Sequence, residues 1–385
     1  MKRFFLFCLI IAFTLVKLFP ADLSGVFDST VNYTKGGGDA PPHSWGMEEF
    51  ANLRLRAGIG EKGIFYSAFN LIVLSGNYLN TQAAIQNTNP YFASTPFIYG
   101  NNYAAAMELE RLYFRINGDY VDFEAGLLRL NFGYGQVWGS SDFLNPRNPL
   151  VTNARPRGLL GADLSFYPTD TLKLMAFAAG PGDPLETEGG GIIPGLSMNQ
   201  HWDKASLEAL YAYETPLNAS PLGIHRFGLS VKADIEIGLV FDTLYTLNPD
   251  ALDGIDGLSA GGGFDYSFFD GNLYILFEYL FNGFSSATAL GFGGSRINHH
   301  YLYGNILYSF NDYSNLGFST VLCFDDLSFS PILSYYFEFF QGFSLNLSAG
   351  FYFDQKDFGG SKAGELGPDY TGARAIVNVG VRLRF

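Results

Sequence analysis

Arginine side chains are concentrated in one part of this 385-residue sequence. Residues 54 to 157 contain eight arginines and a single lysine, Lys62. The arginines are Arg54, Arg56, Arg111, Arg115, Arg129, Arg147, Arg155 and Arg157. A planar guanidinium binds carboxylate and phosphate groups through paired hydrogen bonds. If the fold brings these side chains to one surface, the sequence predicts a site that attracts anions.

Catalytic and metal-binding chemistry finds little support in the sequence. The five histidines are His43, His201, His225, His299 and His300. None belongs to an HExxH motif or to a Cys/His zinc spacing. Asp250, Asp253 and Asp256 lie three residues apart, which is not the order of a calcium loop. We therefore expect no enzyme activity, no cofactor and no metal site.

The elements that position the arginines are predicted to be strands. Residues 375–385 alternate between apolar and mostly polar or small side chains, and residues 345–353 do the same. Only 16% of the residues are charged, against about 25% in average soluble domains. After the N-terminal segment, no apolar run is long enough for a spanning helix. These features predict an all-β fold, a transmembrane antiparallel β-barrel, with a soluble β-sandwich or propeller as the alternative.

Loop lengths predict the topology of this barrel. Short turns at 60–63, 117–120 and 168–171 alternate with long loops at 76–103 and 180–192. Both termini are expected to be periplasmic, so the number of strands must be even. We expect about 18 strands, with 16 as the alternative. The last strand should close the barrel against the first, because an open edge is not tolerated in lipid.

The N-terminus has the layout of a secretory signal. Lys2 and Arg3 precede an apolar run that ends at Val16, and the small residue Ala21 follows Pro20. The run is too short to span a bilayer. We expect residues 1–21 to be a signal peptide and residues 22–385 to form a single barrel domain in the outer membrane.

Strand parity predicts which side chains line the pore. In the second strand Leu53 and Leu55 should face lipid, because a lipid-facing arginine costs roughly 2–4 kcal/mol at mid-membrane. Their neighbours therefore face inward. The predicted pore-lining residues are Arg54, Arg56, Arg111, Tyr113, Arg115, Asp122, Glu124, Asp265, Glu278 and Arg382. Glu108 and Glu110 have lipid-facing parity unless a β-bulge redirects them. The inward arginines either give an anion preference, or they pair with the inward carboxylates, or the two sets form an unselective transverse field.

A long loop, around residues 131–158, is expected to fold into the lumen as a constriction. It follows a strand, is rich in Gly, Asn and Pro, and carries aromatic residues to pack with. Its expected site residues are Asn131, Gly133, Gly135, Trp138, Asp142, Asn145, Pro146, Arg147, Arg155 and Arg157. The alternative is an external loop that packs on the mouth of the barrel.

This loop segment resembles that of porin-like outer-membrane barrels, which carry a pattern close to G-[KR]-Q-x-x-N-W-G-x-G followed by P-x-D-x-x-N-P. The matching positions are Gly126, Asn131, Gly133, Gly135, Trp138, Asp142, Asn145 and Pro146. The departures are Leu127, Leu128, Phe132 and Ser140. The pair Glu278-Tyr279 is similar to a second family segment. The resemblance implies a channel or export-type porin, and the aromatic end at Phe385 resembles the strand that the barrel-assembly machinery reads.

Together these features predict an outer-membrane porin for passive diffusion of small hydrophilic solutes, with anions as one alternative. Two other functions stay open: a transporter of hydrophobic or aromatic solutes, and a surface structural or adhesion barrel. The net charge of −14 argues against nucleic acid as a partner. The expected partners are outer-membrane lipid, lipopolysaccharide-type lipid, the barrel-assembly machinery and small solutes, and homo-oligomer formation stays open.

Overall fold

The computed structural model describes residues 21–38, 40–77, 98–100, 102–145, 158–180, 191–216, 223–247, 257–283 and 298–385. The expected signal peptide, apart from Ala21, lies outside these residues. In the described part, no helix has the length and apolar character needed to cross a membrane.

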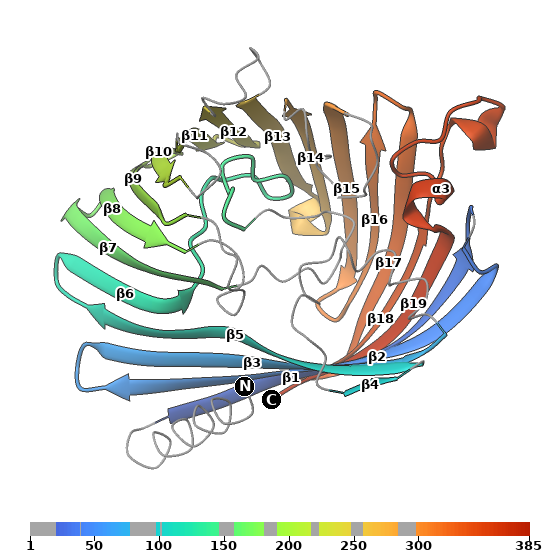
Figure 1. The fold of residues 1–385 in the computed structure, drawn as a ribbon, viewed down its shortest axis with the longest axis horizontal. Helices are drawn as coiled ribbons and strands as arrows, with labels where there is room; N and C mark the ends of the chain where they lie inside the picture. Colours follow the sequence, from blue (N-terminus) through green and yellow to red (C-terminus); the bar gives the residue numbers. More distant parts are fainter. Residues whose placement is uncertain are drawn as a thin grey trace.

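Eighteen antiparallel strands form a closed barrel, which confirms the predicted fold class and strand number (Figure 1). The first nine wall strands are β1 (Ala21–Gly36), β2 (His43–Ile59), β3 (Gly63–Gly76), β5 (Tyr103–Asn117), β6 (Val121–Leu128), β7 (Leu159–Thr169), β8 (Leu172–Ala179), β9 (Ile193–Trp202) and β10 (Ala205–Glu214). The other nine are β11 (Ile224–Asp234), β12 (Gly238–Leu247), β13 (Leu258–Phe268), β14 (Leu273–Asn282), β15 (His300–Asn311), β16 (Ser314–Cys323), β17 (Ser328–Phe340), β18 (Phe343–Phe351) and β19 (Ala373–Arg384). A short strand, β4 (Ile98–Gly100), adds to one end of β5.

All connections at one end of the barrel, the end where β1 begins and β19 ends, are short turns. The turn between β9 and β10, for example, is only Asp203 and Lys204. Lys62, in the turn between β2 and β3, donates a hydrogen bond at 2.8 Å to Asp119, in the turn between β5 and β6, and this bond lowers the pKa of Asp119. We call this end the turn end and the opposite end the loop end, because the long connections lie there.

Alternation along each strand separates an apolar outer face from a polar inner face. In β19, Val377, Val379, Val381 and Leu383 are all exposed on the outside of the barrel. Arg382, between two of them, points inward and forms a bidentate pair with Asp28 of β1 at 2.6 and 3.1 Å. This ion pair lies directly across the seam where the last strand joins the first.

A β-bulge in β5 changes the parity of two acidic residues. The pairing with β3 shifts between Ala68 and Phe69, so that Glu110 is an extra residue without a direct partner. Glu108 consequently turns inward and accepts a hydrogen bond from Asn70 at 3.0 Å. Glu110 accepts one from Asn52 at 2.7 Å. The inserted residue thereby removes both carboxylates from the outer face.

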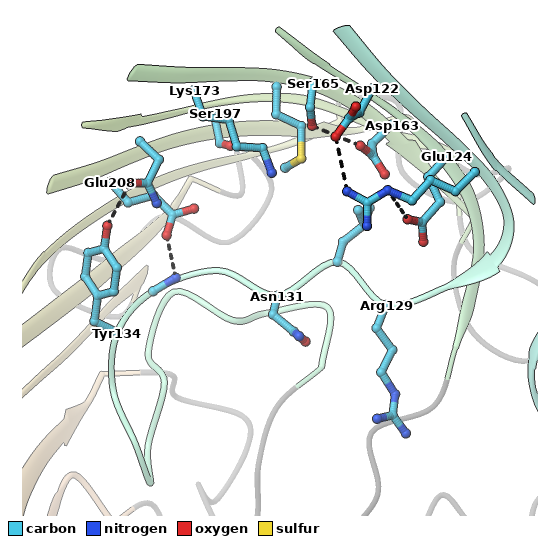
Figure 2. A pocket seen from close by; sticks show the side chains of 15 residues that line it. Asp122, Glu124, Arg129, Asn131, Tyr134, Asp163, Ser165, Lys173, Ser197 and Glu208 are labelled. Carbon is cyan, nitrogen blue, oxygen red and sulfur yellow. Dashed lines mark hydrogen bonds and ion pairs between the residues drawn. The ribbon is translucent and has the colours of Figure 1, made fainter. Parts of the chain in front are cut away.

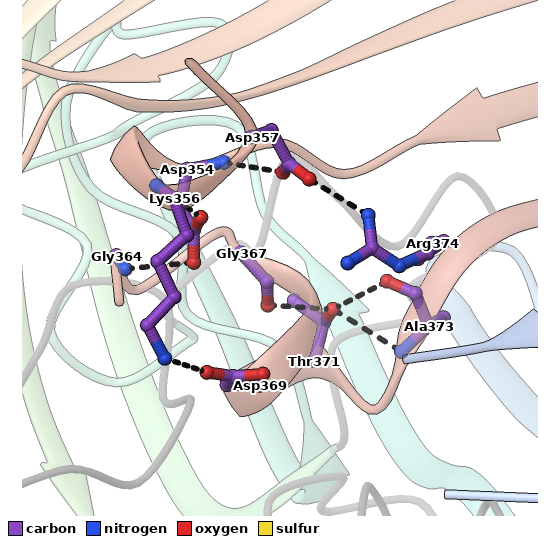
Figure 3. Close-up of polar contacts among 9 residues, drawn as sticks. All are labelled: Asp354, Lys356, Asp357, Gly364, Gly367, Asp369, Thr371, Ala373 and Arg374. Carbon is purple, nitrogen blue, oxygen red and sulfur yellow. Dashed lines mark hydrogen bonds and ion pairs between the residues drawn. The ribbon is translucent and has the colours of Figure 1, made fainter. Parts of the chain in front are cut away.

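The loop between β18 and β19 is ordered by local capping. It contains two short helices, η4 (Gln355–Phe358) and α3 (Pro368–Thr371). The Asp354 carboxylate caps η4, and Arg374 at the start of β19 donates to Asp357 at 2.7 Å (Figure 3). The Lys356 ammonium hydrogen-bonds Asp369, and this bond raises the pKa of Lys356. Another short helix, η3 (Phe269–Gly271), forms the turn between β13 and β14.

Candidate functional site

The segment after β6, residues 129–145, lies inside the barrel against the wall formed by β10 to β14 (Figure 1). We call this segment the inner loop. The wall strands β10, β12 and β14 each contribute one inward carboxylate to it: Glu208, Asp242 and Glu278. We call these three residues the anchor carboxylates.

Six consecutive residues of the inner loop donate their backbone N–H groups to the anchor carboxylates. Gly133 donates to Glu208 at 2.9 Å. Tyr134 and Gly135 donate to the two oxygens of Asp242 at 3.0 and 2.5 Å. Gln136, Val137 and Trp138 donate to Glu278 at 2.6, 2.9 and 3.0 Å. Each carboxylate is nearly buried and needs such donors, because an unpaired buried charge is costly.

Glycine is required where the inner loop approaches Asp242. A Cβ on Gly135 would lie 2.6 Å from an Asp242 carboxylate oxygen and 2.7 Å from the Gly139 nitrogen. Gly133 has φ +82°, and a Cβ there would lie 2.5 Å from the Ser141 hydroxyl. The two glycines that match the porin-like pattern therefore let the backbone reach the wall.

An apolar patch on the inner wall receives the first part of the inner loop. Phe132 packs on Phe177 of β8 with ring centroids 5.0 Å apart, and on Phe143 at 6.1 Å. Met175 and Leu210 belong to the same buried cluster. These wall residues face inward, where the wall of a wide transmembrane barrel is ordinarily polar, so they mark the place where the loop docks.

Trp138 docks into a second buried cluster closer to the loop end. Its indole N–H donates to the Glu278 carbonyl at 3.2 Å, and its ring lies 5.7 Å from that of Tyr301. Leu366, from the loop between β18 and β19, belongs to this cluster. The neighbouring Glu365 accepts a hydrogen bond from the Tyr301 hydroxyl at 2.6 Å. A second loop thus reaches the residues that hold the inner loop.

The two limbs of the inner loop are tied together at their base. The Asn145 side chain donates to the Leu130 carbonyl at 2.6 Å. Ser141 shares a hydrogen bond with Ser230 of β11 at 2.6 Å. Asp142 is buried, and its N–H closes a turn onto Gly139 at 2.8 Å. Asn145 thereby acquires a structural role that its residue type alone does not reveal.

Four of the five predicted pore-lining arginines, Arg54, Arg56, Arg111 and Arg115, lie on the inner face of β2 and β5, on a different arc of the wall from the anchor carboxylates, and the fifth, Arg382, lies on β19. Arg111 lies over the ring of Tyr66 at 4.9 Å, and Tyr66 stacks on Tyr113 at 5.1 Å. Arg54 donates to the Asn52 side chain. Tyr66 thus contacts both the Arg111 guanidinium and the Tyr113 ring.

Arg111 and Arg115 of β5, and Arg129 of the inner loop, are paired with carboxylates. Arg115 lies 3.2 Å from Asp122 and 3.9 Å from Glu124. Arg129 pairs with Glu110 at 2.8 Å, and Arg111 lies 3.6 Å from the same carboxylate. Among the described residues, no carboxylate lies within 4.0 Å of the guanidinium groups of Arg54 and Arg56. Arg54 and Arg56 of β2 therefore keep an uncompensated positive charge in the described wall.

A cavity of about 360 Å³ lies between the inner loop and the wall strands β5 to β10 (Figure 2). Asp122, Glu124 and Asp163 line one part of it, while Glu208 and Tyr134 lie at the other part. Asn131, one of the predicted loop residues, borders the cavity from the loop side. The lining is strongly polar and carries both signs of charge, which suits passage of hydrated solutes.

The other predicted site residues fall into two groups. Glu278 and Asp265 were expected to line the pore. Glu278 is instead covered by the inner loop, because its carboxylate is the acceptor for three backbone donors. Asp265 accepts a hydrogen bond from the Gln136 side chain at 3.1 Å. Pro146, Arg147, Arg155 and Arg157 lie outside the described residues.

Sequence reasoning missed Glu208 and Asp242 as functional residues. Both occupy inward positions whose neighbours have the opposite parity: Leu207 and Ala209 flank Glu208, and the exposed Phe241 precedes Asp242. Parity alone could have found them. In the described part of the chain, no group of three or more His, Cys, Asp or Glu side chains is placed to hold a metal ion.

Comparisons with known proteins agree on the fold. No family model and no curated protein matches the sequence. Among solved structures, OccAB4 of Acinetobacter baumannii aligns with a TM-score of 0.60 and 12% identity, covering 95% of this chain and 98% of that one. OccAB1 of the same organism aligns with 0.56 and 13%, covering 95% and 96%. OccK7 of Pseudomonas aeruginosa aligns with 0.55 and 11%, covering 95% and 99%. At these identities the likeness shows a common fold.

Proposed function

We propose that this protein is an outer-membrane porin in which the inner loop narrows a channel for passive diffusion of small hydrophilic solutes. The observation that carries the proposal is the set of six backbone hydrogen bonds that hold residues 133–138 against the inner wall. A loop held at this place reduces the free cross-section without closing the barrel with a separate domain. The chain shares its fold with OccAB4, OccAB1 and OccK7, and a closed wall of 18 strands is wide enough to leave an aqueous channel, which supports the proposal.

The solutes proposed are small and hydrophilic, with a preference for anions. The preference rests on Arg54 and Arg56, for which the described wall provides no ion-pair partner. The paired arginines contribute less, since nearby carboxylates offset their charge. An exposed apolar belt supports integral membrane insertion, with lipid covering the outer face.

Single-channel recording tests this function. Refolded residues 22–385 are compared with a variant that lacks residues 134–156. We expect stable conductance steps for both proteins and a larger conductance for the deletion variant, because the inner loop no longer occupies the lumen. Equal conductance would contradict the constriction, and a folded but silent barrel would contradict the channel.

A transporter for hydrophobic solutes fits the structure less well. The described cavity lining is charged and polar, and the inward aromatic residues Phe132 and Phe177 are buried in packing between the loop and the wall. Within the described residues, no separate plug domain fills the barrel.

A further inference from the structure

Three histidines on the outer face occur in the same arrangement with a tyrosine. The hydroxyl of Tyr33 lies 2.7 Å from His43 Nδ1. Tyr211 and His225 are related in the same way at 2.9 Å, and Tyr279 and His300 at 2.6 Å. We call these the tyrosine–histidine pairs.

The three pairs share one geometry. Each joins the two strands of a hairpin that is connected at the loop end: β1 with β2, β10 with β11, and β14 with β15. In each hairpin the tyrosine lies opposite the residue two positions after the histidine. These opposite residues are Trp45, Phe227 and Leu302. Three repeats of one diagonal contact, far apart in the sequence, indicate a common requirement at this level of the barrel.

The pairs lie at the upper border of the apolar belt. Below them on the same outer face are exposed apolar side chains such as Val31 and Leu229, and above them the strands pass into the loops. Trp45 and Phe227 beside two of the pairs are more than 45% exposed. In a membrane-inserted barrel this border is where headgroups begin.

Each pair presents a hydrogen-bond donor outward. When the tyrosine hydroxyl donates to Nδ1, the imidazole carries its proton on Nε2. In the described structure, Nε2 of these histidines has no hydrogen-bond partner. Lys35, exposed and directly opposite His43 in the register, adds an ammonium group next to the first pair. A donor with a cation nearby suits phosphate oxygens.

We propose that the tyrosine–histidine pairs bind the phosphate groups of the glycolipid in the outer leaflet. The inference rests on the proposed outer-membrane location. The three pairs should differ in how strongly they bind phosphate. The pair with Lys35 should bind most strongly, and the pair at His300 most weakly, because Asp325 accepts the backbone N–H of His300 at 2.8 Å and places a carboxylate nearby.

The test measures lipid that stays with the folded barrel after gel filtration. The probes are bis-phosphorylated lipid A, lipid A without phosphates, and phosphatidylcholine. The main variant is the triple replacement His43→Phe, His225→Phe and His300→Phe, which keeps a ring of similar size. Its matched control is His201→Phe, at the turn end, where Nδ1 is bonded to Ser206 at 2.8 Å and no tyrosine is involved.

We expect the triple variant to retain about threefold less bis-phosphorylated lipid A, the size of effect that modest hydrogen bonds produce. Retention of the two other lipids should not change, nor should that of any lipid by the His201→Phe variant. Equal retention of lipid A with and without phosphates by the wild type would overturn the proposal, as would an unchanged triple variant.

A second variant keeps the proposal testable if the histidine replacements prevent folding. Tyr33→Phe, Tyr211→Phe and Tyr279→Phe together remove only the hydroxyls that orient the imidazoles. A smaller loss of phosphate-dependent retention is expected, and no loss contradicts the pairing. Conductance of the same samples separates the two proposals: a conducting barrel without phosphate preference refutes lipid recognition alone, and a silent wild type refutes the channel.

Discussion

At Glu278 one carboxylate accepts three consecutive backbone N–H groups and so decides the path of the inner loop. Glutamine at this position has the same shape but only one acceptor oxygen, and its amide would point hydrogens at the loop's own donors. Glu278 is therefore the residue whose replacement should disturb the inner loop most. The side chains of residues 136 and 137 matter less for holding the loop, because Glu278 binds the backbone N–H groups of these residues.

For Glu278→Gln we expect a loss of about 1–3 kcal/mol in the free energy that holds the loop, the cost of leaving buried donors unsatisfied. Single-channel current should become noisier, with excursions to higher conductance. Asp265→Asn is the matched control, since Asp265 contacts the loop only through the Gln136 side chain. Current traces that resemble the wild type would show that the carboxylate does not hold the loop.

For Gly135→Ala we expect displacement of the inner loop from Asp242, because the added Cβ would lie 2.6 Å from a carboxylate oxygen. Overpacking of this kind costs roughly 1–3 kcal/mol. Trypsin or another protease should then cut the loop faster in the folded barrel. Gly262→Ala serves as control: its Cβ would meet nothing closer than 3.6 Å. Equal cleavage rates for both variants would argue against the close approach.

Among the elements, two loops meet at Trp138. The inner loop supplies the indole, and the β18–β19 loop supplies Leu366, which has no exposed surface. The buried carboxylate of Glu365 bonds Tyr301 and the Asn298 side chain, at 2.6 and 2.8 Å. A polar network and an apolar cluster thus connect the constriction to a loop far away in the sequence.

For Leu366→Ala we expect a cavity next to Trp138 and a loss of about 2–5 kcal/mol in local packing. The emission of Trp138 should shift to longer wavelength as its ring becomes hydrated. The measurement uses a Trp45→Phe, Trp202→Phe background, because these are the other two tryptophans. Phe358→Ala, on the exposed side of the same loop, provides the comparison and should leave the emission in place.

On the scale of the whole molecule, charge is distributed unevenly around the barrel. The anchor carboxylates of β10, β12 and β14 are occupied by backbone donors, whereas Arg54 and Arg56 of β2 face the lumen without a described acidic partner. The bulge in β5 reduces this asymmetry, because it directs Glu108 and Glu110 inward on the same arc as the arginines, where they bond Asn70 and Asn52.

Replacing Arg54 and Arg115 with glutamate should shift ion selectivity toward cations. A unit charge 8 Å from the path of an ion changes its energy by about 0.5 kcal/mol in water, and each reversal changes the charge by two units, so it should change the permeability ratio about fivefold. The reversal potential under a salt gradient measures this. The neutral pair Arg54→Gln and Arg115→Gln should lie between the wild type and the glutamate variant. An unmoved potential would assign these arginines a purely structural role.

The alternation of side chains allowed the barrel, its 18 strands and the inward direction of the β2 and β5 arginines to be predicted from the sequence. Alternation is local, since neighbouring residues of a strand must face opposite sides.

The docking of the inner loop could not be predicted in this way. Gln136 and its acceptor Glu278 are 142 residues apart, and only closure of the barrel brings them together. Parity left Glu108 facing lipid unless a β-bulge redirected it, and the one inserted residue in β5 does so. The sequence by itself therefore determined the wall, through a local two-residue period. The tertiary structure alone decided which part of the wall the inner loop binds and which carboxylates it covers. Those contacts join the loop to strands that are distant in the sequence and come near it only in the closed barrel.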